Sequence, residues 1–345
     1  MTSYRTIRAS GFSLVIAPKR LALLLALTLL IFLVALWSIS SGTKHIPFGE
    51  IFTALFTSDA QPSTDANVVV DFRLSRLTLA LVSGAMLGVA GAIMQSLTRN
   101  GLADPSLLGV REGAALSVLV CLFLVPSLPT ALRPVAGVIG GLTSAVIVFA
   151  LSGVTSRLRF VLTGIGFSWF LSALLLILMA SLDIRSLQSA MIWMAGNLQG
   201  ASWDAVSILA IILAAALVLV CVTARAADTQ ALGDSAAAAL GINLRFLSSL
   251  HFSLAVTLTA SCVSYTGSIG FVGLIGPHIA RFLMPGGSFL GITVGAGLTG
   301  ALLVTTADTI ARTAFSPLEL PTGLVLSAVG APTLLLLLWL HRHRL

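Results

Sequence analysis

Asp308 is the acidic residue that lies deepest within apolar sequence, and Arg312 follows it at the spacing of an ion pair. On a helix, two residues four apart lie one turn from each other on the same face. An ionisable group inside a membrane is costly and is usually kept for function, for example as a proton relay. Because a cation one turn away neutralises the carboxylate, a structural ion pair is favoured over a relay.

Nucleotide-binding and metal-binding motifs are missing from the sequence. A P-loop needs Gly-x-x-x-x-Gly-Lys-Ser/Thr, but the two lysines, Lys19 and Lys44, follow Pro18 and Thr43. There is no H-E-x-x-H motif, and the five histidines are scattered. No nucleophile and base are spaced for an enzyme either. We therefore expect no catalytic residue, no metal site, no cofactor and no ATP bound by this chain alone.

The composition indicates a protein that lies mostly within a membrane. Hydrophobic residues make up 57% and charged residues 9% of 345 positions, whereas a soluble domain has about 25% charged residues. About 20 apolar residues cross a bilayer as a helix, and nine runs suit this length. They are Leu21–Thr43, Leu77–Thr98, Gly113–Leu132, Pro134–Ser156, Phe160–Leu182, Ala205–Ala224, Phe246–Ala280, Phe282–Ala307 and Leu320–Leu340. The long seventh run is interpreted as a full span followed by a short or broken one, which gives an all-α polytopic protein with about ten transmembrane helices.

The basic residues predict the orientation of this single domain, residues 1–345. Arg5, Arg8, Lys19 and Arg20 precede the first apolar run, and Lys and Arg concentrate on the cytoplasmic side of membrane proteins. Residues 1–20 are therefore expected in the cytoplasm, and ten crossings return the C-terminus there. The net charge of +7 follows from this topology, so membrane lipid is expected as a partner and nucleic acid is not.

The loop Arg225–Arg245 contains the sequence of a short helix outside the membrane. Asp234 suits an N-cap, the following "SAAAAL" favours a helix, and Gly241 suits a C-cap. So short a helix is not stable alone in water. We expect residues 228–245 to pack against a cytoplasmic partner, and a solvated turn is the alternative.

Two glycine- and proline-containing segments interrupt the apolar pattern. "GSIGFVGLIGPHIARFL" (Gly267–Leu283) has a glycine at every third position at first, then Pro277, and His278 and Arg281 near its end. It is interpreted as a hinge with a polar end at the cytoplasmic side, or as a kinked structural helix.

In "GLADPSLLG", Asp104 suits an N-cap and Pro105 the first helical position, so a helix start is expected at the cytoplasmic face. Arg111 and Glu112 then occupy the start of a span. They can pair with each other or with a partner, and the sequence assigns them no role.

Four segments together resemble the FecCD-type permeases, the membrane subunits of ATP-binding-cassette (ABC) importers for ferric siderophores, haem and cobalamin. The resemblance extends from about residue 20 to the end, in the same order and spacing. The segments are Arg73–Val110, Leu187–Trp203, Ser268–Leu283 and Ala307–Pro332.

The resemblance implies a type II ABC importer permease fold in a bacterial inner membrane. A homodimer, or a dimer of two similar permeases, would pass the solute along its interface, with two ATPase subunits inside and a periplasmic solute-binding protein outside. A ferric siderophore is the expected solute, haem or cobalamin is the alternative, and an ion-coupled secondary carrier is less favoured.

The resemblance also implies site residues. Arg73, Arg76 and Arg312 match positions that meet acidic residues of the binding protein, although interfacial snorkelling also explains Arg73 and Arg76. At Arg111–Gly113, "REG" replaces a more usual small polar pair. The expected ATPase contacts are Gly233, Asp234, Ala237, Leu240, Gly241, His278 and Arg281.

Overall fold

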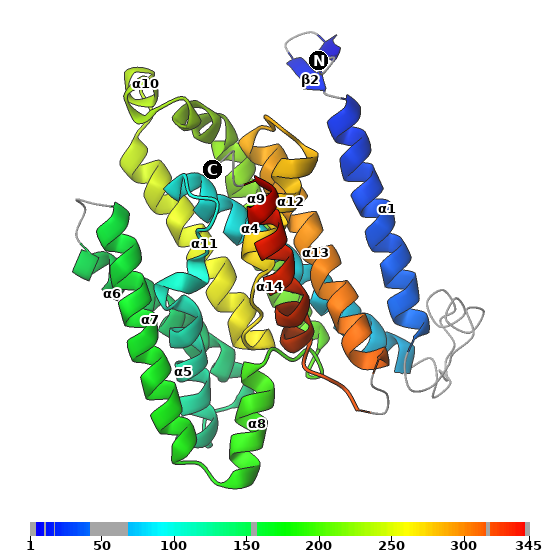
Figure 1. The fold of residues 1–345 in the computed structure, drawn as a ribbon, viewed down its shortest axis with the longest axis vertical. Coiled ribbons are helices and arrows are strands. Elements are labelled where there is room, and N and C mark those ends of the chain that lie inside the picture. Colours follow the sequence, from blue (N-terminus) through cyan, green and yellow to red (C-terminus); the bar gives the residue numbers. More distant parts are fainter. Residues whose placement is uncertain are drawn as a thin grey trace.

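The computed structural model describes residues 5–9, 12–16, 18–41, 68–152, 157–314 and 318–341, and nearly all of them are helical (Figure 1). This confirms the all-α prediction, to which the structure adds an antiparallel hairpin of β1 (Arg5–Ala9) and β2 (Phe12–Ile16). The helices are α1 (Pro18–Ser40), π-helical η1 (Val68–Leu74), α4 (Ser75–Thr98), 3-10 helical η2 (Pro105–Leu108), α5 (Val110–Phe123), 3-10 helical η3 (Thr130–Leu132), α6 (Arg133–Ser152), α7 (Arg157–Ala180), α8 (Ile184–Met194), α9 (Trp203–Ala231), α10 (Asp234–Ala239), α11 (Leu244–Thr266), α12 (Val272–Leu283), α13 (Phe289–Thr313) and α14 (Thr322–His341).

Within the described part of the chain, seven helices are long and apolar enough to cross a membrane: α1, α4, α6, α7, α9, α11 and α13. Helices α12 and α14 are apolar but contribute shorter segments, and α5 has only 14 residues. The prediction of a protein with several transmembrane helices is therefore confirmed. The exact number of ten transmembrane helices stays a prediction.

The long seventh apolar run is divided as expected. Helix α11 ends at Thr266 because Gly267 turns the backbone into the left-handed region with φ of 70°, which glycine adopts without a Cβ clash. Helix α12 then begins at Val272 and contains Pro277. Proline has no N–H for the carbonyl four residues earlier, and that carbonyl, of Gly273, accepts a hydrogen bond from Gln95 Nε2 at 3.2 Å instead.

The third apolar run does not form the full span that we predicted for Gly113–Leu132. Helix α5 ends at Phe123, and Pro126 and Pro129 follow in the connection to α6. Proline disfavours helical backbone at the residue before it and cannot donate to the helix. Apolar composition alone therefore predicted a helix that is too long and ends too late in the chain.

Helix α4 lies at the centre of the bundle and packs closely on α13, α11 and α12. A side chain at Gly84 or Gly88 would overlap the backbone of Gly300 or Ala296 on α13. Small residues spaced as G-x-x-x-G allow this close approach of two helices. On α6, a side chain at Gly137 or Gly141 would overlap the side chain of Ser264 or Ala260 on α11.

Candidate functional site

Two ion pairs lie at opposite ends of the bundle, Arg76 with Asp308 and Arg99 with Asp234. One end, called here the α10 end, carries α10 and the C-terminus of α4. The opposite end, called the α8 end, carries α8 and the segment before α14. Helix α8 is N-capped by Asp183, whose carboxylate accepts from the N–H groups of Arg185 and Ser186. Helix α8 covers the beginning of the segment Leu187–Trp203 and ends at Met194.

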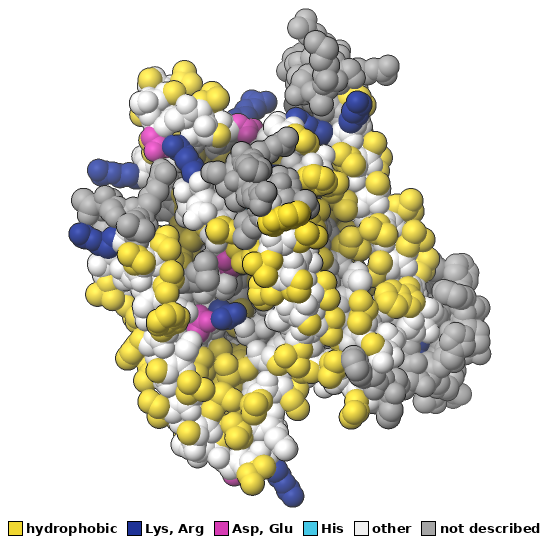
Figure 2. Space-filling model, in the orientation of Figure 1, with side chains coloured by type: hydrophobic (Ala, Val, Ile, Leu, Met, Phe, Trp, Pro, Cys, Tyr) yellow, Lys and Arg dark blue, Asp and Glu magenta, His cyan; other side chains and the backbone are white. Residues whose placement is uncertain are grey.

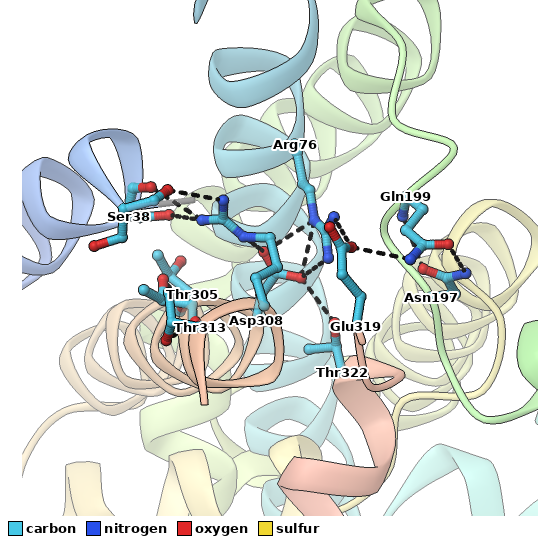
Figure 3. Close-up of polar contacts among 12 residues, drawn as sticks. Ser38, Arg76, Asn197, Gln199, Thr305, Asp308, Thr313, Glu319 and Thr322 are labelled. Atoms are coloured by element: carbon cyan, nitrogen blue, oxygen red, sulfur yellow. Dashed lines mark hydrogen bonds and ion pairs between the residues drawn. The ribbon is translucent and has the colours of Figure 1, made fainter. Parts of the chain in front are cut away.

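A buried carboxylate, Asp308, organises the α8 end (Figure 3). Its Oδ1 accepts from Arg76 Nη2 at 2.9 Å and from the Thr322 hydroxyl at 2.9 Å. Its Oδ2 pairs with Arg312 Nε at 3.3 Å, one turn along α13. The predicted ion pair of Asp308 and Arg312 is therefore confirmed, and Arg76 joins it from α4.

The same network reaches three further elements. Arg76 Nη1 binds Glu319 at 2.8 Å, and Gln199 Nε2 binds the same carboxylate oxygen at 2.9 Å. Arg312 Nη2 donates to the Ser38 carbonyl and hydroxyl on α1 (Figure 3). Partial burial opposes ionisation of Glu319, but these hydrogen bonds and charges outweigh it and lower the pKa of its carboxyl group. The network thus ties α1, α4, α13 and the ends of two loops together.

The arginines predicted for docking do not share one environment. Arg76 and Arg312 have side chains only 12% and 10% exposed. Arg73 is half-buried in η1 and donates to the Ile39 carbonyl of α1 at 2.7 Å. Arg73 and Arg76 are three residues apart but reach different elements. The wider π-helical turn of η1 changes the angle between residues three apart.

At the α10 end, the short helix α10 forms as predicted, with different capping at its start. The N-cap is Gly233, and Asp234 is the first helical residue. The Asp234 carboxylate instead binds Arg99 Nη2 at 2.6 Å, just beyond the end of α4. At the other end, Gly241 has φ of 81° and donates to Ala238, while Ile242 donates to Ala237. This is a Schellman C-cap.

The exposed side of α10 is apolar. Leu240 is 71% exposed, and Leu232 and Phe246 on the flanking helices are 79% and 65% exposed. Ala237 is fully buried, so it anchors α10 on the bundle, whereas its neighbours face outward. Of the other coupling candidates, His278 bonds the Leu274 carbonyl at 2.8 Å and lies beside Gly101, and Arg281 is half-buried in the last turn of α12.

Asp104 and Pro105 begin a helical turn, but inside the bundle and not at its face. Asp104 is the N-cap of η2 and accepts from the N–H of Ser106 at 2.7 Å, with Pro105 as the first residue of η2. Asp104 is only 9% exposed, and Gly273 of α12 lies against its carboxylate. The cap prediction is confirmed and its position is corrected, because the chain turns back into the bundle after Arg99.

Arg111 and Glu112 pair with each other, one of the two outcomes that the sequence left open. Arg111 Nε and Nη2 lie 3.0 and 2.7 Å from Glu112 Oε1. The Glu112 side chain is 6% exposed and that of Arg111 is 38% exposed. Among the described residues, no group of three or more His, Cys, Asp or Glu side chains could hold a metal ion.

Sequence reasoning missed Arg99, Gln199, Glu319 and Thr322 as partners in these two sites. Their partners lie on distant segments, so no local spacing identifies them. The one available signal was Glu319 itself, an acidic residue in a short connection between two apolar runs.

Comparisons with known proteins agree over nearly the whole chain. The model of the FecCD transport family matches residues 28–340. The achromobactin transport system permease of Dickeya dadantii (strain 3937) is 38% identical, over 91% of this chain and 90% of its own. The hemin transport system permease of Yersinia pestis is 35% identical, over 92% and 95%.

A solved structure, described as an inward-facing conformation of a metal-chelate type ABC transporter, superimposes with a TM-score of 0.81. It is 26% identical and covers 92% of this chain and 99% of its own. The family model, the relatives and the solved structure agree with one another over nearly the whole chain. The chain belongs to the FecCD transport family.

Proposed function

We propose that this chain is the permease subunit of an ABC importer in a bacterial inner membrane and carries a ferric siderophore from the periplasm to the cytoplasm. The observation that carries the proposal is the match to the FecCD transport family over residues 28–340. Relatives named for achromobactin, iron and Fe(3+) dicitrate transport support an iron chelate as the solute. The hemin transport relative keeps haem as the second candidate, and cobalamin remains a third.

An ATPase contact at the α10 end is supported by the surface described above. Leu240 and Leu232 lie outside the candidate spans, and Phe246 lies in the first turn of α11. An exposed apolar patch in water marks an interaction site. In the proposal, Leu240 and Gly241 contact the ATPase. Gly233 and Asp234 set the start of α10, Ala237 holds it on the bundle, and His278 and Arg281 lie at the end of the neighbouring helix α12. The chain has no P-loop, so separate ATPase subunits would supply the energy.

A binding-protein contact at the α8 end completes this arrangement. Arg73 is half-buried at the α8 end and would supply positive charge for acidic groups of a binding protein. Exposed charges of this kind mainly steer association. In the proposal, the buried network of Arg76 and Arg312 holds the elements of that surface in place. The termini would then lie in the cytoplasm, on the side of α10.

A dimer of permeases, of two identical or two similar chains, would form the path for the solute. Both α7 and α14 carry large exposed apolar side chains, including Trp169, Phe170, Leu324 and Val329. In the proposal, a second permease covers part of this surface, and lipid covers the rest.

An ion-coupled secondary carrier is the competing hypothesis, and Asp308 would have to bind and release the coupling ion. Its two carboxylate oxygens accept or pair with Arg76, Arg312 and Thr322. Partners from this chain therefore already occupy both oxygens that a coupling ion would need. The geometry therefore favours a structural role.

The test is reconstitution of the permease with its ATPase and binding protein in liposomes. We expect radiolabelled ferric siderophore to accumulate only when ATP, the ATPase and the binding protein are all present. A heme-loaded binding protein tested in the same liposomes separates the two leading solutes. Sustained accumulation by the permease alone would contradict the proposal.

A further inference from the structure

The ion pair of Arg111 and Glu112 lies halfway through the bundle, because α5 begins there. A side chain at Gly109, just before α5, would touch Ser168, which lies at the middle of α7. The Val110 carbonyl lies against Gly141, near the middle of α6. The chain reaches this depth through residues 99–109, which enter from the α10 end, where Arg99 binds Asp234.

A second interrupted helix meets this point from the opposite end. After α11 ends beside α8, residues 267–271 turn inward, and α12 begins at Val272, which contacts Gly300 in the middle of α13. Phe271 has φ of 67°, a left-handed conformation that is unusual for a bulky residue. Gly270 of this segment lies beside Arg111 Nη1. Two helices thus start at mid-depth with the Arg111 guanidinium next to both, and helix starts carry positive partial charge.

The guanidinium has donors left for a ligand. A guanidinium has five N–H groups, and Nε and Nη2 bind Glu112 Oε1. Among the described residues, none accepts a hydrogen bond from Arg111 Nη1. The other Glu112 oxygen, Oε2, is buried without a hydrogen-bond partner. Glu112 therefore holds the guanidinium from one side and leaves its Nη1 side open.

The exposure of Arg111 fits a polar passage better than a lipid contact. Its side chain is 38% exposed, while the exposed residues of α7 and α14 are mainly large and apolar. Figure 2 shows that this face of the molecule is mostly yellow and white, with few blue or magenta side chains away from its ends. A charged side chain at mid-membrane is costly in lipid and usually faces a polar cavity or a partner.

We propose that Arg111 is a mid-membrane contact for anionic oxygen atoms of the transported iron chelate, and that Glu112 positions its guanidinium. This inference rests on the proposed function and adds the chemical class of the solute. The starts of α5 and α12 add positive potential, in the manner of interrupted helices that face anionic groups in transporters. The nearby acidic groups are Glu112 and Asp104, and Asp104 is already bound by the N–H and hydroxyl of Ser106. The open side of the guanidinium is the part left for the solute.

The test compares two radiolabelled probes in liposomes that contain the complete importer: an anionic carboxylate chelate of iron and a neutral hydroxamate chelate. We expect wild type to carry the anionic chelate, and Arg111→Gln to slow its uptake about tenfold, the factor typical of losing a charged hydrogen bond. Arg111→Lys should retain part of the rate. ATP hydrolysis stimulated by the binding protein should be unchanged in both variants, because it reports assembly and coupling.

A second variant separates contact with the solute from a structural role. Arg111→Gln with Glu112→Gln leaves no buried charge unpaired, and we expect it to assemble, to hydrolyse ATP and still to transport the anionic chelate slowly. Full transport by this double variant, or by Arg111→Gln, would overturn the inference. Wild-type uptake of the neutral chelate only would also overturn it and leave the proposed function standing. No uptake of any iron chelate by wild type would instead contradict the proposed function.

Discussion

Arg99 and Asp234 join the end of the central helix α4 to the start of α10, with 2.6 Å between Nη2 and Oδ1. Arg99 Nη2 also donates to the Gln230 carbonyl at the end of α9, at 3.0 Å. Helix α4 packs on α13, α11 and α12, so a movement of α10 has a direct polar connection to the core of the bundle.

Breaking this connection should affect coupling more than stability. Both side chains are about half exposed, and exposed ion pairs contribute about 0–1 kcal/mol. We expect Arg99→Glu to lower transport per ATP hydrolysed and to change the melting temperature little. The measurement is uptake and hydrolysis in the same proteoliposomes. The exchange Arg99→Asp with Asp234→Arg should restore coupling; if it does not, the pair itself does not matter.

Leu240 should be required for ATPase binding. It is 71% exposed on α10, and a charge there would be desolvated in an apolar contact. We expect Leu240→Glu to reduce co-purification of the ATPase without unfolding the permease. Leu318→Glu is the matched control, because Leu318 is 74% exposed at the opposite end. Equal ATPase recovery in both variants would show that α10 is not the contact.

Arg73 should steer the binding protein. Reversing its charge leaves the buried network of Arg76 and Arg312 intact and changes a half-buried charge at the α8 end. We expect Arg73→Glu to slow association of the binding protein, with an effect that shrinks as salt screens the charges. Surface plasmon resonance at two salt concentrations measures this. Arg225→Glu changes the net charge equally at the α10 end and should have no effect on association.

We expect Asp308 to stabilise the folded permease and to have no part in coupling transport to a proton gradient. Asp308→Asn removes the counter-charge of Arg312 and one of the two counter-charges of Arg76, which still pairs with Glu319. Removing one partner of a buried pair costs about 3 kcal/mol. We expect a lower melting temperature and less folded protein. Uptake per folded permease should still require ATP and resist a protonophore. The exposed Asp204, changed to Asn, is the control for general charge effects. Proton-dependent uptake lost only in Asp308→Asn would favour the secondary carrier.

Gly84 should tolerate no side chain. An added Cβ would overlap the backbone of Gly300 on α13, and backbone cannot move aside as a flexible side chain can. We expect Gly84→Val to cost about 3 kcal/mol or more, the upper part of the range for overpacking. Gly166→Val is the matched control, because nothing lies within 4 Å of a Cβ at Gly166. Thermal unfolding in detergent compares the two.

The sequence predicted the local features of this fold well. The pair of Asp308 and Arg312 is one turn apart on one helix, so spacing alone identifies it. Gly241 ends α10 because a left-handed residue needs glycine, a rule that acts within a few residues. The break between α11 and α12 follows from Gly267 in the same way.

The long-range partners could not be predicted from spacing. Arg76 and Asp308 are 232 positions apart, and periodicity describes only neighbours on one element. Asp234 was assigned as a cap because Asp is common there, whereas Arg99 from another helix binds its carboxylate. The sequence also could not show how deep in the bundle a helix such as α5 begins. Hydropathy reports only how apolar a segment is.

The 14-residue length of α5 has a consequence for how the chain enters the bilayer during synthesis. At about 1.5 Å per residue it is shorter than the ~30 Å hydrocarbon layer, so it makes a poor independent insertion signal. Ser117 and Gly113 of α5 lie directly against Gly140 of α6. The two helices therefore form a natural biogenesis unit, in which the nascent α5 is retained in lipid only once α6 has emerged from the ribosome.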